Sequence, residues 1–86
     1  MDINELILLI EGKIRKNIIV QNISIQDKTH LHKNHLSHQK GKFHLLINIK
    51  SEELSKQSKV QSTKKIYKIL DDEIKKFIHS IQILIN

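Results

Sequence analysis

Histidine is concentrated in one stretch of this chain. Five of the six histidines lie between Asp27 and His44, in the run DKTHLHKNHLSHQKGKFH, and the sixth is His79. Neutral imidazole is a common ligand of zinc, copper, nickel and iron. Because the run is polar and lacks a hydrophobic period, residues 28–41 are predicted to form a loop. The sequence therefore predicts a histidine-rich loop held opposite one histidine on a core strand.

Two loop histidines have a spacing that suits metal binding. His30 and His32 lie two residues apart, so in an extended loop their side chains would point the same way and could chelate one metal ion. The spacing matches no standard closed zinc site, which disfavours a structural zinc ion. His38 and His44 are interpreted as ordinary residues, the first solvated in the loop and the second facing outward from a strand.

Residue types outside the loop disfavour catalysis. The chain has no cysteine nucleophile and no glycine-rich phosphate loop. Asp71, Asp72 and Glu73 share one helical turn and are interpreted as surface charge. Ser62 and Thr63 are interpreted as solvent-facing, because nothing in the sequence places a base beside either hydroxyl. We therefore expect a protein that is not an enzyme.

Two helices and three strands are expected to position the histidines. Apolar residues recur every three or four positions, the period of an amphipathic helix, in residues 3–16 and 60–76. Apolar and polar residues alternate, as in half-buried strands, in residues 18–27, 42–50 and 77–86. The first two strands follow one another along the chain after a helix, which favours an antiparallel pair covered on one face.

The last predicted strand places His79 in an apolar row. Its alternating neighbours are Phe77, Ile81, Ile83 and Ile85, so the imidazole is predicted to face the core. A buried polar ring needs a hydrogen-bond partner. Two interpretations stay open: a structural histidine hydrogen-bonded near a strand end, or a ligand at the margin of the sheet.

Length and composition limit the remaining possibilities. The chain has 86 residues, a net charge of +6 and no cysteine. Its length suits a single domain spanning residues 1–86, and without thiols any iron–sulfur chemistry needs sulfur from another molecule. The first apolar run is interrupted by Asn4 and Glu5 and lacks a basic leader, so we expect a soluble, cytoplasmic protein without membrane contacts.

Lysines gather in the polar segment at residues 51–59, which is expected to be irregular with a turn at 51–54, and in the helix that follows. No acidic residue separates Lys56, Lys59, Lys64, Lys65 and Lys68. This surface is either simply solvated or contacts phosphates or a protein partner. The segment has no GxxG clamp and the chain has three aromatic residues, which disfavours base stacking.

Several motifs together resemble the BolA family. They are Asp27-x-Thr29-x-x-His32-x-x-His35, Gly41-x-x-His44, Ser51-x-x-Leu54, Val60-x-x-x-Lys64-x-Ile66-Tyr67-x-x-Leu70 and Ile78-His79-Ser80-Ile81. They cover nearly the whole chain and occur in the order and at the spacing typical of that family. His79 falls on the family's signature C-terminal histidine.

The resemblance implies a fold and a partner. The implied fold is a small α+β domain of αββαβ(α) order, with a three-stranded mixed sheet, helices on one face and a class II K-homology-like arrangement. BolA-like proteins pair with monothiol glutaredoxins and share a [2Fe-2S] cluster, to which glutaredoxin and glutathione supply sulfur. Carried onto this chain, the ligands are His79 and His32, with His30 and His35 as alternatives to His32.

The resemblance also implies a biological role. That role is iron–sulfur cluster assembly or trafficking, or iron regulation, with no cluster expected in the isolated chain and a monomer or weak homodimer when alone. The alternative is a transcriptional regulator that binds DNA through the lysine-rich second helix.

The chain departs from the family pattern at three places. Leu54 and Lys56 stand where phenylalanine and glycine are usual, and Ser62-Thr63-Lys64 stands where Arg-His-Arg is usual. The sequence ends at Asn86 without the usual closing segment, which supplies a short third helix. These differences bear on partner and nucleic-acid surfaces more than on the fold.

Overall fold

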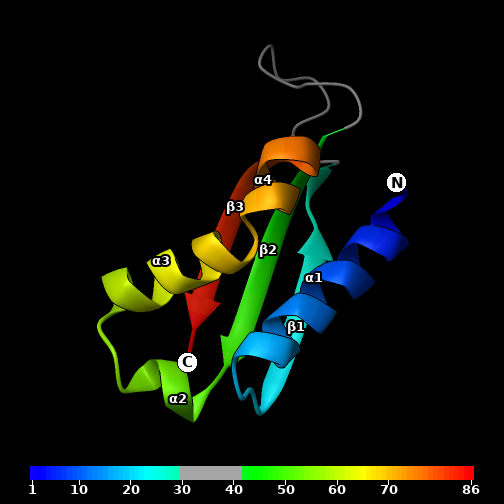
Figure 1. The fold of residues 1–86 in the computed structure, drawn as a ribbon. Coiled ribbons are helices and arrows are strands. Elements are labelled where there is room, and N and C mark those ends of the chain that lie inside the picture. The colour runs from blue at the N-terminus through cyan, green and yellow to red at the C-terminus, as the bar shows by residue number, and fades with distance from the viewer. Residues whose placement is uncertain (30–41) are drawn as a thin grey trace.

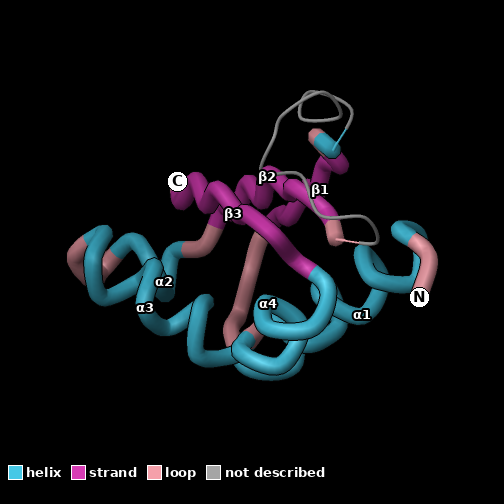
Figure 2. The backbone as a smooth tube through the Cα atoms, turned by 90° about the horizontal axis from the view of Figure 1, so that it is seen from above, coloured by secondary structure: helices cyan, strands magenta, loops and turns pink. Residues whose placement is uncertain are grey.

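Helices cover one face of a three-stranded sheet in the computed structural model of this chain (Figure 1). The structure describes residues 1–29 and 42–86. Within these residues the elements are, in chain order, α1 (Ile3–Asn17), β1 (Asn22–Asp27), β2 (Phe43–Lys50), α2 (Glu52–Ser55), α3 (Lys59–Ile69), α4 (Asp71–Phe77) and β3 (Ile78–Ile85). Seen from above, the helices and the sheet form two layers (Figure 2). The predicted α+β class is confirmed.

The sheet is mixed, as predicted, with β2 in the centre. β1 pairs with β2 antiparallel, with Ile25 opposite Ile47, and β3 pairs with β2 parallel, with Leu45 opposite Ile81. An antiparallel pair needs only a loop between its strands, whereas the parallel pair needs a crossover, which helices α2 to α4 provide. As a result β1 ends, and β2 and β3 begin, at the same end of the sheet (Figure 1).

Helix α1 follows from capping and spacing. Asp2 accepts a hydrogen bond from the backbone N–H of Glu5 at 2.8 Å, which satisfies one of the free donors of the first turn. Leu6, Ile10 and Ile14 are four residues apart and fully buried on the face toward the sheet. The backbone becomes extended at Ile18, where the helix ends.

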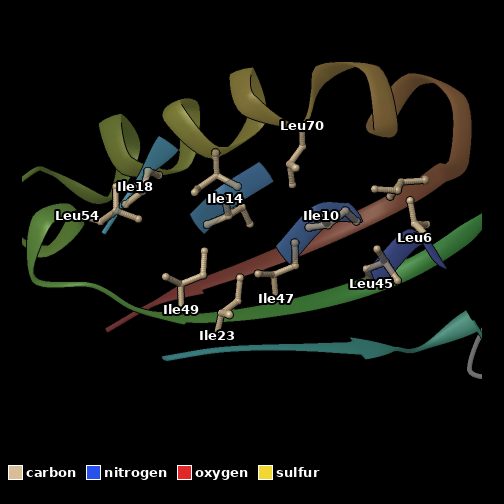
Figure 3. Packing of buried hydrophobic residues seen from close by; sticks show 12 residues of the cluster. Leu6, Ile10, Ile14, Ile18, Ile23, Leu45, Ile47, Ile49, Leu54 and Leu70 are labelled. Atoms are coloured by element: carbon tan, nitrogen blue, oxygen red, sulfur yellow. The ribbon is translucent and has the colours of Figure 1, made fainter. Parts of the chain in front are cut away.

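The core lies between the two layers and consists of leucine and isoleucine (Figure 3). Alternate residues of β2, among them Ile47 and Ile49, meet Ile14 of α1 and Ile66 of α3 there. Each of these side chains is fully buried. Burial of one such side chain contributes roughly 2 kcal/mol, so the apolar row of the central strand is a main source of stability.

Three predicted boundaries are wrong. The first strand begins at Asn22 and not at residue 18, because Ile18 leaves the helix and packs in the core while Ile19 is 70% exposed. The predicted helix over residues 60–76 is divided between α3 and α4 at Leu70, which leaves helical geometry with its side chain fully buried.

The third wrong prediction concerns residues 51–59, which were expected to be irregular but contain helix α2. The hydroxyl of Ser51 accepts a hydrogen bond from the N–H of Leu54 at 3.2 Å and donates one to the carbonyl of Ile19 at 2.8 Å. Ser51 is fully buried, so its two hydrogen bonds are made away from solvent. The serine thus caps α2 and fastens it to the chain that follows α1.

Two helical residues predicted to be on the surface are buried. The hydroxyl of Ser62 donates a hydrogen bond to the carbonyl of Leu54 at 2.8 Å, which joins α3 to α2. Glu73 is 5% exposed, and its carboxylate forms an ion pair with Lys13 of α1, whose Nζ atom lies 2.9 Å away. This hydrogen bond raises the pKa of Lys13 above its ordinary value.

Candidate functional site

Two histidine rings meet at the end of the sheet where β2 and β3 begin. His44 lies on β2 and His79 lies on β3, and their ring centroids are 4.8 Å apart with the planes tilted by 60°. Neighbouring parallel strands that start at the same end bring these residues together although they are far apart in the sequence. The sequence predicted His79 as a site residue but did not predict this pair.

A β-bulge determines how far each side chain of β3 is buried here. Phe43 pairs with Ile78, but His44 pairs with Ser80, so His79 is an extra residue in β3. Ile78 is 4% exposed and belongs to the core, whereas His79 is partly exposed. The predicted core-facing position of His79 is therefore at the margin of the core, where its ring packs against His44 and still has access to solvent.

His44 lies on the face of β2 opposite its core-facing neighbour Leu45, as predicted, but the prediction that it is an ordinary outward residue is wrong. His44 is 4% exposed, and its Nδ1 atom lies 2.6 Å from the hydroxyl oxygen of Ser80. The bulge sets Ser80 opposite His44, and the ring of His79 packs against the ring of His44. A polar ring is tolerated in this buried position because it is hydrogen-bonded.

The backbone of His44 is hydrogen-bonded to the two residues that follow β1. Its N–H donates a hydrogen bond to the hydroxyl of Thr29 at 3.1 Å, and its carbonyl accepts one from the N–H of Lys28 at 2.7 Å. Asp27 accepts from the N–H of Thr29 at 3.0 Å and also from the Thr29 hydroxyl. These contacts fix the two points from which residues 30–41 leave and return.

The sequence contained a signal for this arrangement. Asp27 and Thr29 belong to one of the motifs that resemble the BolA family, and His44 belongs to another. Recognising His44 as a buried partner required knowing that the two motifs are adjacent in space. Its position in an alternating strand predicted an exposed ring, because alternation assigns the face of a side chain but takes no account of a bulge in the neighbouring strand.

The other candidate ligands, His32 with the alternatives His30 and His35, lie outside the described residues, as does His38. In the sequence these histidines lie between Thr29 and Lys42. Both of these flanking residues lie at the same end of the sheet as His79. Within residues 1–29 and 42–86, no three histidine, aspartate or glutamate side chains are grouped so that they could hold a metal ion. Residue 79 is thus the candidate ligand that the structure places.

A hollow of about 250 Å³ lies beside the histidine pair. His44 and Ser80 form one end of it, and Leu46 and Gln82 continue it along the two strands. Lys28 borders the hollow and adds a cation. The hollow offers room for a side chain of a partner close to the histidines.

Comparison with protein families identifies this architecture. The family model described as BolA-like protein matches residues 14–86. The chain belongs to the BolA-like protein family. A comparison with curated protein sequences gave no significant match.

Solved BolA structures share the fold of this BolA-like chain. The BolA domain of SufE1 from Arabidopsis thaliana is 24% identical, with 92% of this chain and 87% of that chain covered and a TM-score of 0.78. BolA1 from Arabidopsis thaliana is 18% identical, with 93% and 88% covered and a TM-score of 0.79. BolA1 from Mus musculus is 14% identical, with 92% and 62% covered and a TM-score of 0.73.

Four of the five predicted surface lysines are exposed in this BolA-like chain. They are Lys56, Lys59, Lys64 and Lys68. Lys65 is partly buried, and its Nζ atom lies 3.3 Å from a carboxylate oxygen of Glu53. The four exposed lysines form a positive surface along α3 and the turn before it.

No helix in the described part of the chain is long and apolar enough to span a membrane.

Proposed function

We propose that this BolA-like chain is the partner of a monothiol glutaredoxin and shares a [2Fe-2S] cluster with it, in cluster assembly or trafficking or in iron regulation. His79 is the proposed C-terminal ligand and His32 the proposed loop ligand. The observation that carries the proposal is the partly exposed ring of His79 at the end of the sheet where both ends of the histidine-rich segment are fixed.

The residues present suit a cluster held jointly with another protein. A neutral imidazole can ligate iron, and a chain without cysteine leaves the sulfur ligands to glutaredoxin and glutathione. Histidine in place of thiolate removes negative charge from the cluster, which raises its reduction potential. A shared site also needs a ligand that the partner can reach, and His79 is partly exposed on an edge strand.

His44 supports this assignment as a positioning residue. Its ring packs against that of His79 and is itself held by Ser80 and by the backbone contacts to Lys28 and Thr29. A ligand whose ring is restrained by its neighbours loses less freedom when it binds a metal. The end of the sheet therefore presents a restrained imidazole to a docking partner.

Cluster assembly with purified proteins tests the proposal. The chain is mixed with a monothiol glutaredoxin, glutathione, iron and sulfide, and the complex is followed by visible circular dichroism and electron paramagnetic resonance. We expect a heterocomplex spectrum that differs from that of glutaredoxin alone and changes in His79→Ala. His38→Ala, a substitution in the same segment as the proposed loop ligand, is the matched control and is expected to leave the spectrum unchanged.

The same measurement distinguishes the loop ligands. We expect His32→Ala to change the spectrum more than His30→Ala or His35→Ala. A heterocomplex whose spectrum is identical in the wild type and in His79→Ala would refute the assignment of His79.

A further inference from the structure

The outer edge of β3 is available for pairing with another strand. Asn86 donates its N–H to the carbonyl of Ile49 at 2.8 Å and accepts from the N–H of Ser51 at 3.2 Å, so its backbone groups face β2. Backbone groups of successive residues in a strand point to opposite sides, so those of Ile83 and Ile85 face away from β2. Within the part of the chain that the structure describes, no hydrogen bond occupies these outward groups.

Tyr67 of α3 confirms the direction of this edge. Its hydroxyl reaches the carbonyl of Ile81 at 3.5 Å, and Ile81 belongs to the same alternating set as Ile83 and Ile85. The Tyr67 hydroxyl therefore occupies the outward carbonyl of Ile81. Ile83 and Ile85, the next residues of the set, are left accessible.

A groove runs between this edge and helix α3. One part has a volume of about 200 Å³ and is lined by Lys59, Thr63, Ile83, Leu84, Ile85 and Asn86. The adjoining part has a volume of about 380 Å³ and is lined by Lys59, Val60, Thr63, Lys64 and Tyr67. The two parts share Lys59 and Thr63, and we call them together the β3-edge groove. Figure 1 shows the N-terminal half of α3 extending past β3, the outer strand.

The groove combines apolar walls with positive charge. Val60 is 63% exposed and Leu84 is 41% exposed, although both are aliphatic. Lys59 and Lys64 border the groove, and α3 contains no acidic residue. An occupant with acidic and aliphatic side chains would neutralise the lysines and cover the aliphatic surface.

The charge argues against a second copy of this chain as the occupant. Each copy has a net charge of +6, and pairing two β3 strands would bring the same lysines together.

The chemistry of the groove also favours a peptide over a nucleic acid. The free backbone groups repeat at about 7 Å, the two-residue repeat of a strand, and Tyr67 is the one aromatic residue lining the groove for base stacking.

We propose that the β3-edge groove binds an extended acidic segment of a partner protein, which adds to the sheet as a fourth strand beside β3. Its backbone pairs with Ile83 and Ile85. Its acidic side chains lie on the α3 side near Lys59 and Lys64, and its aliphatic side chains lie on the opposite face beside Leu84. The proposal concerns a surface distinct from His79 and needs no cluster, so it stands or falls independently of the proposed function.

Titration of the isotopically labelled chain with a synthetic peptide tests the proposal. The probe is acetyl-Glu-Val-Asp-Ile-Glu-Val-Asp-amide, followed by backbone amide shifts and by calorimetry. We expect saturable binding with the largest shifts at Ile83, Ile85 and Thr63. The Lys59→Glu/Lys64→Glu variant is expected to bind about tenfold more weakly or not at all.

Two controls separate strand addition from general attraction between charges. The Lys16→Glu/Lys76→Glu variant carries the same change in net charge on α1 and α4 and is expected to bind the peptide with little loss. The same peptide with alternate backbone amides N-methylated keeps every charge but cannot pair, and we expect it to lose binding at least about tenfold. Circular dichroism checks that both variants remain folded.

The remaining outcomes overturn the proposal. Failure of the peptide to shift the β3 resonances at millimolar concentration would remove it. If the N-methylated peptide bound as tightly as the unmethylated one, the groove would be a nonspecific positive surface and not a site of strand addition. A short oligothymidine that shifts the same residues and displaces the peptide at lower concentration would assign the groove to single-stranded nucleic acid.

Discussion

The hydrogen bond between His44 and Ser80 joins residues that are 36 positions apart in the chain. It forms at the bulge that makes His79 the extra residue of β3. His44 is buried and Ser80 is exposed, so the serine hydroxyl supplies a polar partner for a ring in the sheet. Ser80 follows His79 in the chain and His44 packs against its ring, so this contact joins two neighbours of His79.

Removing this hydroxyl should weaken the fold and loosen the ring of His79. We expect Ser80→Ala to lower the free energy of unfolding by about 1 kcal/mol, because the substitution deletes a hydrogen bond to a buried ring. Urea denaturation measures this change, and the imidazole resonances of His44 and His79 should move in the same variant. Ser24→Ala, the same substitution at an exposed position of β1, should do neither. Unchanged imidazole resonances in Ser80→Ala would show that the serine does not position His79.

At the scale of elements, polar contacts connect the helices to one another. Ser62 ties α3 to the carbonyl of Leu54 at the end of α2, and Ser51 ties α2 to the carbonyl of Ile19. Lys13 and Glu73 tie α1 to α4, the helix that leads directly into His79. These links hold the crossover that places β3 beside β2.

The Lys13–Glu73 pair predicts a pH dependence of stability. The hydrogen bond to Glu73 raises the pKa of Lys13 above its ordinary value of 10.5. Because this pKa is higher in the folded chain than in the unfolded chain, the contribution of the pair is fully present below pH 10.5 and is lost as the pH rises through the folded pKa.

Denaturation of the wild type and of Lys13→Met over a pH series measures this contribution. We expect the wild type to be the more stable of the two below pH 10.5 and the difference to shrink above it. Lys16→Met is the matched control, since Lys16 is exposed in the last turn of the same helix and should change stability little. A difference that stays constant through the alkaline range would contradict this role of the pair.

At the scale of the whole molecule, β2 holds the structure together. It pairs with both other strands and carries apolar residues that contact α1 and α3 through the core. Ile47 lies in the middle of this strand and is fully buried. A loss of packing at Ile47 therefore affects the sheet and the helices at once.

Shortening Ile47 should have a graded effect on stability. Ile47→Val should lower the free energy of unfolding by about 1 kcal/mol and Ile47→Ala by about 3 kcal/mol, because the second substitution leaves a larger cavity. Thermal or urea denaturation measures both changes. Leu84→Ala on the partly exposed outer strand is the comparison and should cost less than about 1 kcal/mol. Equal losses at Ile47 and Leu84 would contradict the central place of β2.

The sequence alone determined the class of fold, the first helix and the three strands, but neither α2 nor the division of the helix over residues 60–76. Spacings of three and four around Leu6, Ile10 and Ile14 predicted α1, and alternation through Leu45, Ile47 and Ile49 predicted the central strand. These predictions succeeded because the period of a side-chain pattern depends on local backbone geometry. The order of the motifs likewise indicated the BolA family, to which the chain belongs.

Only the tertiary structure decided the chemistry around His79. The bulge opposite Phe43 and His44, the partnership of His44 with Ser80 and the burial of Glu73 each depend on residues from distant parts of the chain. Strand alternation placed His44 on the surface and its acidic neighbours placed Glu73 there, because neither local signal contains information about which segment packs against these residues. The free edge of β3 is also a property of the sheet as a whole, since a strand becomes an edge only when the order of all strands is known.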